Sequence, residues 1–129
     1  LEVLKIAISQ KMENYYNSVF NRYILREKMR LLFEKYDLLV TPTLPCTAFE
    51  AGQGVPKQFP DRNIVSWVYY TYPFNLTGQP AASMNVGFDK NNLPVGMQII
   101  SKINCENKIF SFAKQLENKL AITDVKPGN

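Results

Sequence analysis

The 129-residue chain contains no histidine. Imidazole is the general base of Ser-His-Asp and Cys-His hydrolases, so both mechanisms are excluded within this chain. A nucleophile acting here would need a lysine or a carboxylate as its base. The carboxylates nearest the predicted central loop, Asp37, Glu50 and Asp61, have no spacing that brings two of them together. Acid–base catalysis by a carboxylate pair is therefore unsupported.

Cysteine is also scarce. Cys46 and Cys105 have no C-x-x-C spacing, and no histidine is available to complete a zinc site. We therefore expect no metal and no cofactor, and we interpret the two cysteines as free thiols of a protein in the reducing cytoplasm.

Long apolar runs and strong charge are missing too. No apolar stretch approaches the roughly 20 residues that a membrane-spanning helix needs. The net charge is only +4, and residues 1–36 carry +3 of it, with seven Lys or Arg against four Asp or Glu. This excess is far below that of a typical nucleic-acid-binding domain, so we expect neither a membrane span nor a nucleic-acid partner.

The first 36 residues have the pattern of helix. Apolar side chains recur every three or four positions, which places them on one helix face, and no glycine or proline interrupts residues 1–41. The residues on this face are Leu4, Ile8, Met12, Tyr15, Val19 and Tyr23. Near the end, Glu27, Arg30 and Glu34 are spaced for ion pairs on the solvent side.

The middle of the chain predicts strands and loops. The run Leu38–Thr41 is short, apolar and followed by Pro42, as in a buried strand. Residues 81–101 predict a β-hairpin, because two strand-like runs flank the turn-forming sequence Asp89–Asn92. Residues 106–120 predict an amphipathic helix with six residues towards the core: Ile109, Phe110, Phe112, Ala113, Leu116 and Leu120.

This inventory predicts an α/β layer. One strand and one hairpin would leave sheet edges uncovered, so we expect the chain to be a fragment of one larger domain. The absence of an initial Met, with helical patterning already present at Leu1, favours the same interpretation. We divide the sequence into helix (1–36), strand and turn (37–45), loop (46–63), an aromatic segment (64–80), hairpin (81–101), helix (106–120) and tail (121–129).

Three motifs carry a family resemblance. They are residues 36–45 (YDLLVTPTLP), 72–81 (YPFNLTGQPA) and 93–100 (LPVGMQII). In this order and at this spacing they resemble the C-terminal third of the amidase-signature enzymes. That family includes general amidases and the A subunit of glutamyl-tRNA(Gln) amidotransferase. The resemblance implies the C-terminal part of a mixed-sheet α/β/α sandwich.

The resemblance also implies a reaction. The family hydrolyses a carboxamide to a carboxylate and ammonia or an amine, through a Ser-Ser-Lys triad and an acyl-enzyme. The triad and its Gly/Ser-rich loop belong to the N-terminal and central parts of the family's domain. No G-G-S-S-G-G-S-like segment occurs in this sequence, so we expect no catalytic residue in this chain and no activity from the chain alone.

By position in the family, four residues are the candidates for the wall of the substrate pocket: Trp67, Tyr70, Thr71 and Phe74. The alternative is that the three aromatic residues simply pack in the core and that Thr71 lies beside them. In the tRNA amidotransferase, an aspartate that binds the substrate's amino group corresponds to Val68 here. Val68 favours a general amidase with a less polar substrate. Asn85 and Ser101 also depart from the family's usual proline and glycine.

Three hypotheses therefore follow. The first is the C-terminal segment of an amidase whose partners are the remainder of the domain, covalently attached or on a separate chain, and a small amide substrate. The second is a stand-alone, non-catalytic domain that binds a protein through its sheet edge. The third is an A-subunit-like part of a tRNA-dependent amidotransferase, and a basic helical module that contacts RNA ranks below all three. Assembly as a homo-oligomer stays open.

Overall fold

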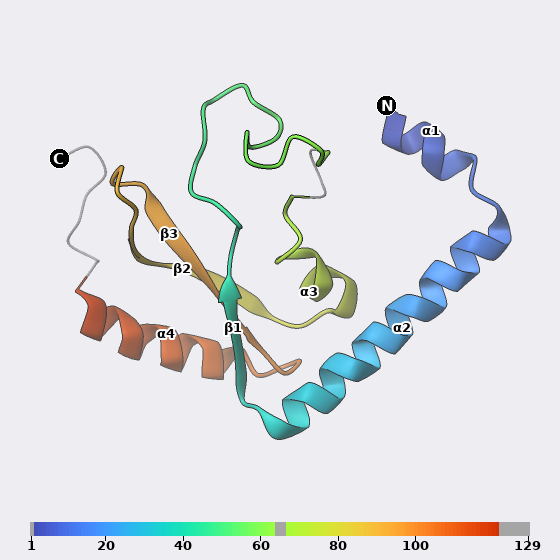
Figure 1. The fold of residues 1–129 in the computed structure, drawn as a ribbon. Coiled ribbons are helices and arrows are strands. Elements are labelled where there is room, and N and C mark those ends of the chain that lie inside the picture. The colour runs from blue at the N-terminus through green and yellow to red at the C-terminus, as the bar shows by residue number, and fades with distance from the viewer. Residues whose placement is uncertain (1, 64–66, 122–129) are drawn as a thin grey trace.

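A computed structural model of the chain describes residues 2–63 and 67–121. Figure 1 shows the path of the chain, with helices at both ends and a small sheet between them. In chain order, the elements are α1 (Glu2–Ile8), α2 (Met12–Lys35), β1 (Leu38–Pro42), α3 (Tyr72–Thr77), β2 (Ala81–Phe88), β3 (Pro94–Ser101) and α4 (Glu106–Leu120).

The three described strands form an antiparallel sheet in the order β1-β3-β2. Ile99 of the central strand pairs with Val40 on one side and with Ala82 on the other. A register irregularity between Asn85 and Gly87 bulges β2 near the hairpin end. β2 and β3 lie where the sequence predicts a hairpin, and β1 lies within the predicted strand and turn.

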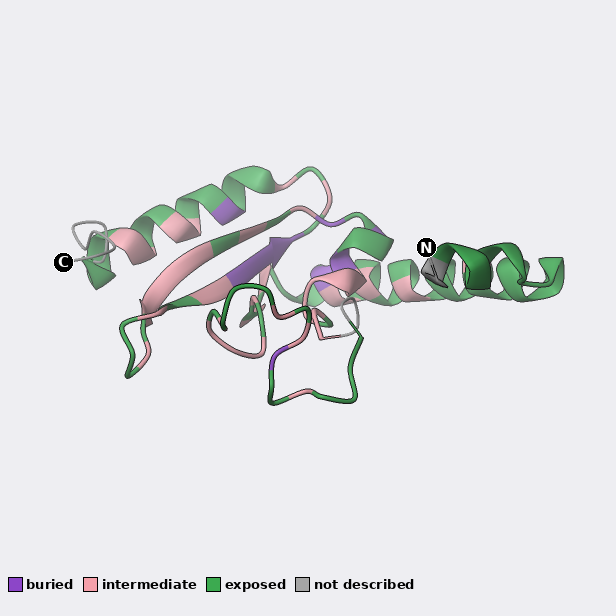
Figure 2. Cartoon of the chain, turned by 90° about the horizontal axis from the view of Figure 1, so that it is seen from above, coloured by how far each residue is buried: buried purple, intermediate pink, exposed green. Residues whose placement is uncertain are grey.

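Helices and loops cover both faces of this sheet. Seen from above in Figure 2, α4 lies along one face, while α3, the end of α2 and the long loop lie on the other. Ile99 and Ile100 point to opposite faces because side chains alternate along a strand, and both are completely buried. The expected α/β fold is confirmed.

The core is centred on Ile100. Phe33 from α2 and Phe74 from α3 pack with it, and Met29, Leu32 and Leu39 line the margin of this cluster. Arg22 joins α2 to α3 by donating from Nε to the carbonyl oxygen of Leu76 at 2.6 Å. The core therefore brings the first and last thirds of the chain together.

Helix α3 has clear start and stop signals. Pro73 lies in its first turn, where a missing N–H costs no helical hydrogen bond. Gly78 ends it at φ +81°, and its N–H donates to the carbonyl of Phe74 at 2.8 Å. The sequence pattern predicted only an aromatic segment over 64–80; residues 64–66 lie outside the described part.

Helix α4 shows one clear difference from expectation. Ile109 is buried and Phe112, Ala113 and Leu116 are half-buried, as the pattern predicts. Phe110, however, is 70% exposed, and Leu120 is exposed as well. Phe110 follows Ile109 directly, so it lies about 100° further round the helix than the residue that faces the sheet.

The N-terminal helical region is interrupted between α1 and α2, with the carbonyls of Lys5 and Ala7 accepting hydrogen bonds from the backbone of Ser9 and Gln10. Most apolar side chains of this region are exposed. They include all of the predicted face except Val19, which is half-buried. The predicted ion pairs of Arg30 with Glu27 (2.8 Å) and with Glu34 are present.

Among the described residues, no helix is both long enough and apolar enough to cross a membrane.

Candidate functional site

One face of the sheet carries a cluster of polar side chains where a simple core would be apolar. Thr41 and Ser83 both pair with Gln98 across the sheet, so the three side chains lie on one face, together with Thr43 and Gly96 two residues further along. This is the face of Ile100. It is apolar near α3 and polar towards the hairpin end.

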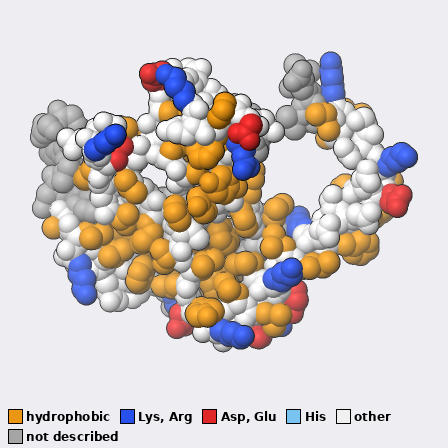
Figure 3. All heavy atoms as spheres, viewed as in Figure 1, with side chains coloured by type: hydrophobic (Ala, Val, Ile, Leu, Met, Phe, Trp, Pro, Cys, Tyr) orange, Lys and Arg blue, Asp and Glu red, His pale blue; other side chains and the backbone are white. Residues whose placement is uncertain are grey.

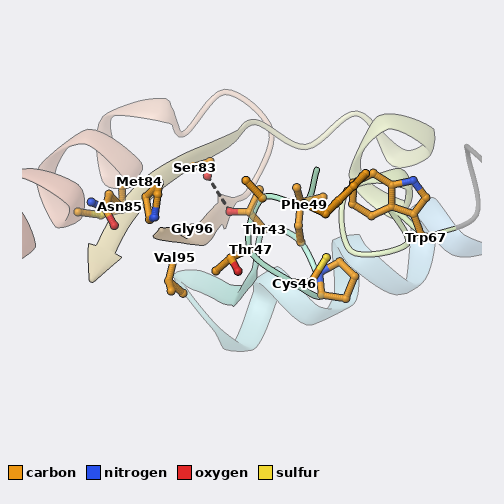
Figure 4. Close-up of a pocket in the computed structure, with 14 residues that line it drawn as sticks. Thr43, Cys46, Thr47, Phe49, Trp67, Ser83, Met84, Asn85, Val95 and Gly96 are labelled. Atoms are coloured by element: carbon orange, nitrogen blue, oxygen red, sulfur yellow. Dashed lines mark hydrogen bonds between the residues drawn. The ribbon is translucent and has the colours of Figure 1, made fainter. Parts of the chain in front are cut away.

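Two hydroxyl groups meet above Gly96. Thr43 Oγ1 and Ser83 Oγ lie 2.7 Å apart, and this hydrogen bond joins β2 to the chain that follows β1 (Figure 4). A Cβ added to Gly96 would lie 3.0 Å from Thr43 Oγ1 and 3.3 Å from Ser83 Oγ. Glycine is therefore required at the central strand so that the two outer segments can bridge over it.

The loop after β1 folds back over this end of the sheet and forms one side of a cavity that is open to solvent. Phe49 packs edge-to-face against Trp67, with ring centroids 5.3 Å apart and an interplanar angle of 79°. We call the space between these rings, the hairpin and the Thr43–Ser83 pair the Trp67 cavity. Its volume is about 570 Å³, a size suited to a small organic molecule. The other lining residues are Leu44, Pro45, Cys46, Thr47, Ala48, Met84, Asn85, Pro94, Val95 and Gly96.

The lining of the Trp67 cavity is uncharged. It includes no Asp, Glu, Lys or Arg side chain, and its polar side-chain groups are hydroxyls, one amide, one thiol and the Trp67 indole N–H, which is buried without a hydrogen-bond partner among the described residues. Burial raises the pKa of the Cys46 thiol, so this group stays neutral at neutral pH. No lysine or carboxylate of the described chain lines the cavity, so the lining residues themselves supply no base to deprotonate Thr43 or Ser83.

The hairpin turn holds the loop in place from the other side. Thr47 Oγ1 donates to Asp89 Oδ2 at 2.8 Å, while Asp89 Oδ1 accepts from the backbone N–H groups of Asn91 (2.8 Å) and Leu93 (3.0 Å). The pKa of the Asp89 carboxyl lies below its ordinary value, mainly because of the Leu93 N–H and then the Thr47 hydroxyl. The ionised carboxylate thus connects the cavity loop to the hairpin.

Of the four predicted pocket-wall residues, only Trp67 lines the Trp67 cavity; the other three lie in the core or in the turn before α3. Trp67 lines the cavity, and Phe74 is buried in the core with Phe33 and Ile100. Thr71 precedes α3 and donates from Oγ1 to the carbonyl of Val68 at 3.0 Å, whereas the carbonyl of Tyr70 accepts a hydrogen bond from Gln98. That these four contact a substrate in the complete protein stays a prediction.

Several residues of this site were not predicted from the sequence. Thr43, Phe49, Ser83 and Gly96 come from three segments that the loop brings together only in the folded chain. One signal was available: an isolated glycine within a strand indicates close approach of another segment, as Gly96 shows. Nothing in the sequence indicated that Phe49 would meet Trp67.

The two departures at Asn85 and Ser101 have local partners. Asn85 Oδ1 accepts from the backbone N–H of Gly87 at 3.0 Å, across the β2 irregularity. Ser101 is completely buried, and its Oγ donates to the carbonyl of Cys105 at 3.0 Å, closing the turn into α4. Both polar side chains are thus accommodated by this fold. Within residues 2–63 and 67–121, no three His, Cys, Asp or Glu side chains come together as a metal site would need.

Comparison of the sequence with known proteins finds the family that the three motifs resemble. A family model described as "Amidase" matches residues 3–110. The A subunit of glutamyl-tRNA(Gln) amidotransferase from Halothermothrix orenii is 36% identical over 107 residues, which cover 82% of this chain and 21% of that protein. The A subunit from Thermotoga maritima is 35% identical over 109 residues, which cover 80% of this chain and 22% of that protein. The chain therefore spans about a fifth of the length of the curated relatives it matches.

Solved structures show the same fold. A 6-aminohexanoate cyclic dimer hydrolase superimposes with a TM-score of 0.83 at 26% identity, covering 98% of this chain and 28% of that one. The A subunit of glutamyl-tRNA(Gln) amidotransferase from Thermotoga maritima gives a TM-score of 0.64 at 32% identity, over 84% of this chain and 24% of that one.

Proposed function

This chain belongs to the amidase family, and we propose that it forms one wall of an amidase substrate pocket while the catalytic triad lies outside these residues. The complete protein then hydrolyses a carboxamide to a carboxylate and ammonia or an amine through Ser-Ser-Lys chemistry. The observation that carries this proposal is the Trp67 cavity, which has polar hydrogen-bonding groups at its floor but no charged base among its lining residues.

The chemistry of the lining supports an uncharged substrate. Once the rest of the domain covers this cavity, an ionised group inside it would lose its water without gaining an opposite charge from these lining residues, which is unfavourable. An amide with an aryl or alkyl substituent would instead place that substituent against Phe49, Trp67 and Val95. The Thr43–Ser83 hydroxyl pair could donate to, or accept from, the polar end of such a molecule.

The partner that we propose is the remainder of an amidase domain, joined covalently or as a separate chain, in the cytoplasm. Two features support it. β1 and β2 each have one edge without a strand partner in the described part of the chain, and large apolar residues of α1 and α2 are exposed. A stand-alone domain that captures another protein by its sheet edge would use the same edges. Capture by a sheet edge alone would leave the exposed apolar residues of α1 and α2 uncovered. The remainder of an amidase domain could cover these helices as well as the edges, so we favour this partner.

A specific observation supports a second candidate function. The sequence relatives from Halothermothrix orenii and Thermotoga maritima are A subunits of glutamyl-tRNA(Gln) amidotransferase, and this chain is 36% identical to the first of them. Under this alternative the pocket would bind glutamine. Val68 counts against it, because valine offers no carboxylate to the amino group of that substrate.

Ligand binding separates these functions, because Trp67 is the one tryptophan in the sequence and reports on the cavity by fluorescence. We expect saturable changes in Trp67 emission with benzamide and none with glutamine. The reverse would support the amidotransferase alternative, and no response to either amide would contradict the pocket.

Two alanines of the same loop provide a matched pair for this assay. Ala48 lines the cavity and Ala51 lies three residues further on, with both exposed. Ala48→Asp enlarges a side chain at the wall and should weaken benzamide binding by about tenfold, or ~1.4 kcal/mol, by crowding the cavity, whereas Ala51→Asp should not.

An amide-hydrolysis assay tests the location of the triad. The purified 129-residue chain should release no ammonia from benzamide above the buffer rate. Robust turnover by this chain alone would overturn the proposal that its catalytic residues lie elsewhere.

A further inference from the structure

A buried glutamine connects the sheet to the Trp67 cavity. Gln98 is 5% exposed at the central strand, and its Nε2 group donates to Thr41 Oγ1 and to the carbonyl oxygen of Tyr70, both at 3.0 Å. Burying an amide is unfavourable unless it is hydrogen-bonded, and an aliphatic residue would fill this core position without that requirement. The two donated hydrogen bonds therefore indicate that Gln98 fixes neighbouring segments as well as filling space in the core.

The segment that Gln98 holds is a closed turn. The backbone N–H of Thr71 and its Oγ1 both donate to the carbonyl of Val68, at 3.1 and 3.0 Å. These bonds make residues 68–71 a compact unit that continues directly into α3. Gln98 fixes this unit to β3 through Tyr70, which lies three residues after Trp67.

Trp67 immediately precedes this turn in the sequence. Its indole ring packs against Phe49 of the loop after β1. The carbonyl of Tyr70 thus connects the turn that follows Trp67 to the central strand of the sheet (Figure 4 shows the indole beside Phe49 at the cavity wall).

We propose that Gln98 is a positioning residue, which holds the 68–71 turn on the sheet, so places the adjacent Trp67 and sets the width of the Trp67 cavity. The part of this inference that concerns substrate size rests on the proposed function; the part that concerns Trp67 does not. In the complete enzyme, Gln98 would determine how large an apolar substituent the amide substrate carries.

Acrylamide quenching of Trp67 fluorescence tests the link in the full chain. Gln98→Met keeps the side-chain volume but removes both donors, and it should increase the population of the displaced turn about fivefold, with stronger quenching and red-shifted emission. Gln79→Met is the matched control. Gln79 is another buried glutamine, 8% exposed, whose Oε1 accepts from Thr77 near the end of α3. It should leave Trp67 quenching unchanged.

Gln98→Glu gives a second variant with a reversible signature. The ionised carboxylate cannot donate to the Tyr70 carbonyl, so Trp67 should be displaced at pH 7. When pH falls below the pKa of the introduced carboxyl, which burial raises, the protonated group can donate again and Trp67 quenching should return towards that of the unmodified chain at the same pH. A merely destabilising change would worsen on acidification instead.

Unchanged Trp67 quenching in folded Gln98→Met and Gln98→Glu, or an equal change in Gln79→Met, would overturn the inference. If Gln98→Met does not fold, the pH-dependent return in Gln98→Glu decides alone. Should Trp67 respond as expected while benzamide binds to neither chain, the positioning role stands and the proposed function fails.

Discussion

The two halves of α2 are both rich in apolar residues but have opposite surroundings. From Leu25 onwards, Met29, Leu32 and Phe33 pack on the sheet and α3. From Met12 to Ile24, the large apolar side chains stand in solvent, as Figure 3 shows in part for the helix that extends away from the body. Those more than half exposed in this half are Met12, Tyr15, Tyr16, Phe20, Tyr23 and Ile24.

Both halves of α2 therefore carry apolar side chains suited to burial, but in the described chain only those of the second half pack in the core cluster. A helix that is hydrophobic on several sides is ordinarily covered. Helices in proteins owe most of their stability to tertiary packing rather than to propensity, so the first half should be the less stable one until another part of the protein covers it. We call α1 and residues 12–24 the arm, and the remainder the body.

The largest loss of folding stability should come from a substitution at the centre of the body. Ile100→Ala removes a completely buried side chain from the cluster with Phe33 and Phe74, and should lower the free energy of unfolding by about 3–4 kcal/mol. Phe20→Ala, in the arm and 63% exposed, should change it by less than ~0.5 kcal/mol. Urea denaturation measures both, and similar losses would abolish the distinction between arm and body.

A smaller loss of stability should follow when a methyl group is added at Gly96, in the body. Gly96→Ala places a methyl group 3.0 Å from Thr43 Oγ1 and should cost about 1–3 kcal/mol of stability. Removing that hydroxyl in the double variant Gly96→Ala/Thr43→Ala should recover part of the loss. An additive double variant, measured by the same urea titration, would mean that the contact above Gly96 is not tight.

The junction between arm and body should matter less. Arg22→Ala removes the hydrogen bond to the carbonyl of Leu76 and should cost on the order of 1 kcal/mol. Arg26→Ala, one turn further along the same helix, has no such contact with α3 among the described hydrogen bonds and serves as the control. Equal thermal stabilities of the two variants would mean that Arg22 does not stabilise the junction.

The smallest effect should be a pH dependence confined to the body. Because the folded pKa of Asp89 is lowered, its stabilisation is complete above the unfolded value of about 3.9 and is lost as pH falls through the folded value. The Tm of the chain should exceed that of Asp89→Asn at pH 7, and the gap should narrow below about pH 4. A constant gap would show that the ionised carboxylate does not hold the turn.

Much of this fold follows from local pattern. The hairpin lies where Asp89–Asn92 supply turn residues, and α4 lies where apolar residues repeat every three or four positions. The break between α1 and α2 carries no glycine or proline to mark it. Periodicity also failed at Phe110, since it indicates a face of the helix but cannot give the width of the surface that covers it.

The candidate site was less accessible from sequence. Trp67 could be chosen from its place beside a family motif, but the contact of Phe49 with it depends on how a long loop closes. The hydrogen bond between Thr43 and Ser83 spans 40 positions of sequence and exists only because the central strand has no side chain at Gly96. Such sites arise from tertiary contacts, which periodicity and turn propensity do not encode.

Hydrogen exchange of the 129-residue chain tests the contrast between arm and body most directly, because it reports local opening at each backbone amide. We predict strong protection across β3 and the second half of α2, and rapid exchange across α1 and residues 12–24. Protection of the arm equal to that of β3, in the monomeric chain, would contradict the claim that this half of α2 lacks its partner.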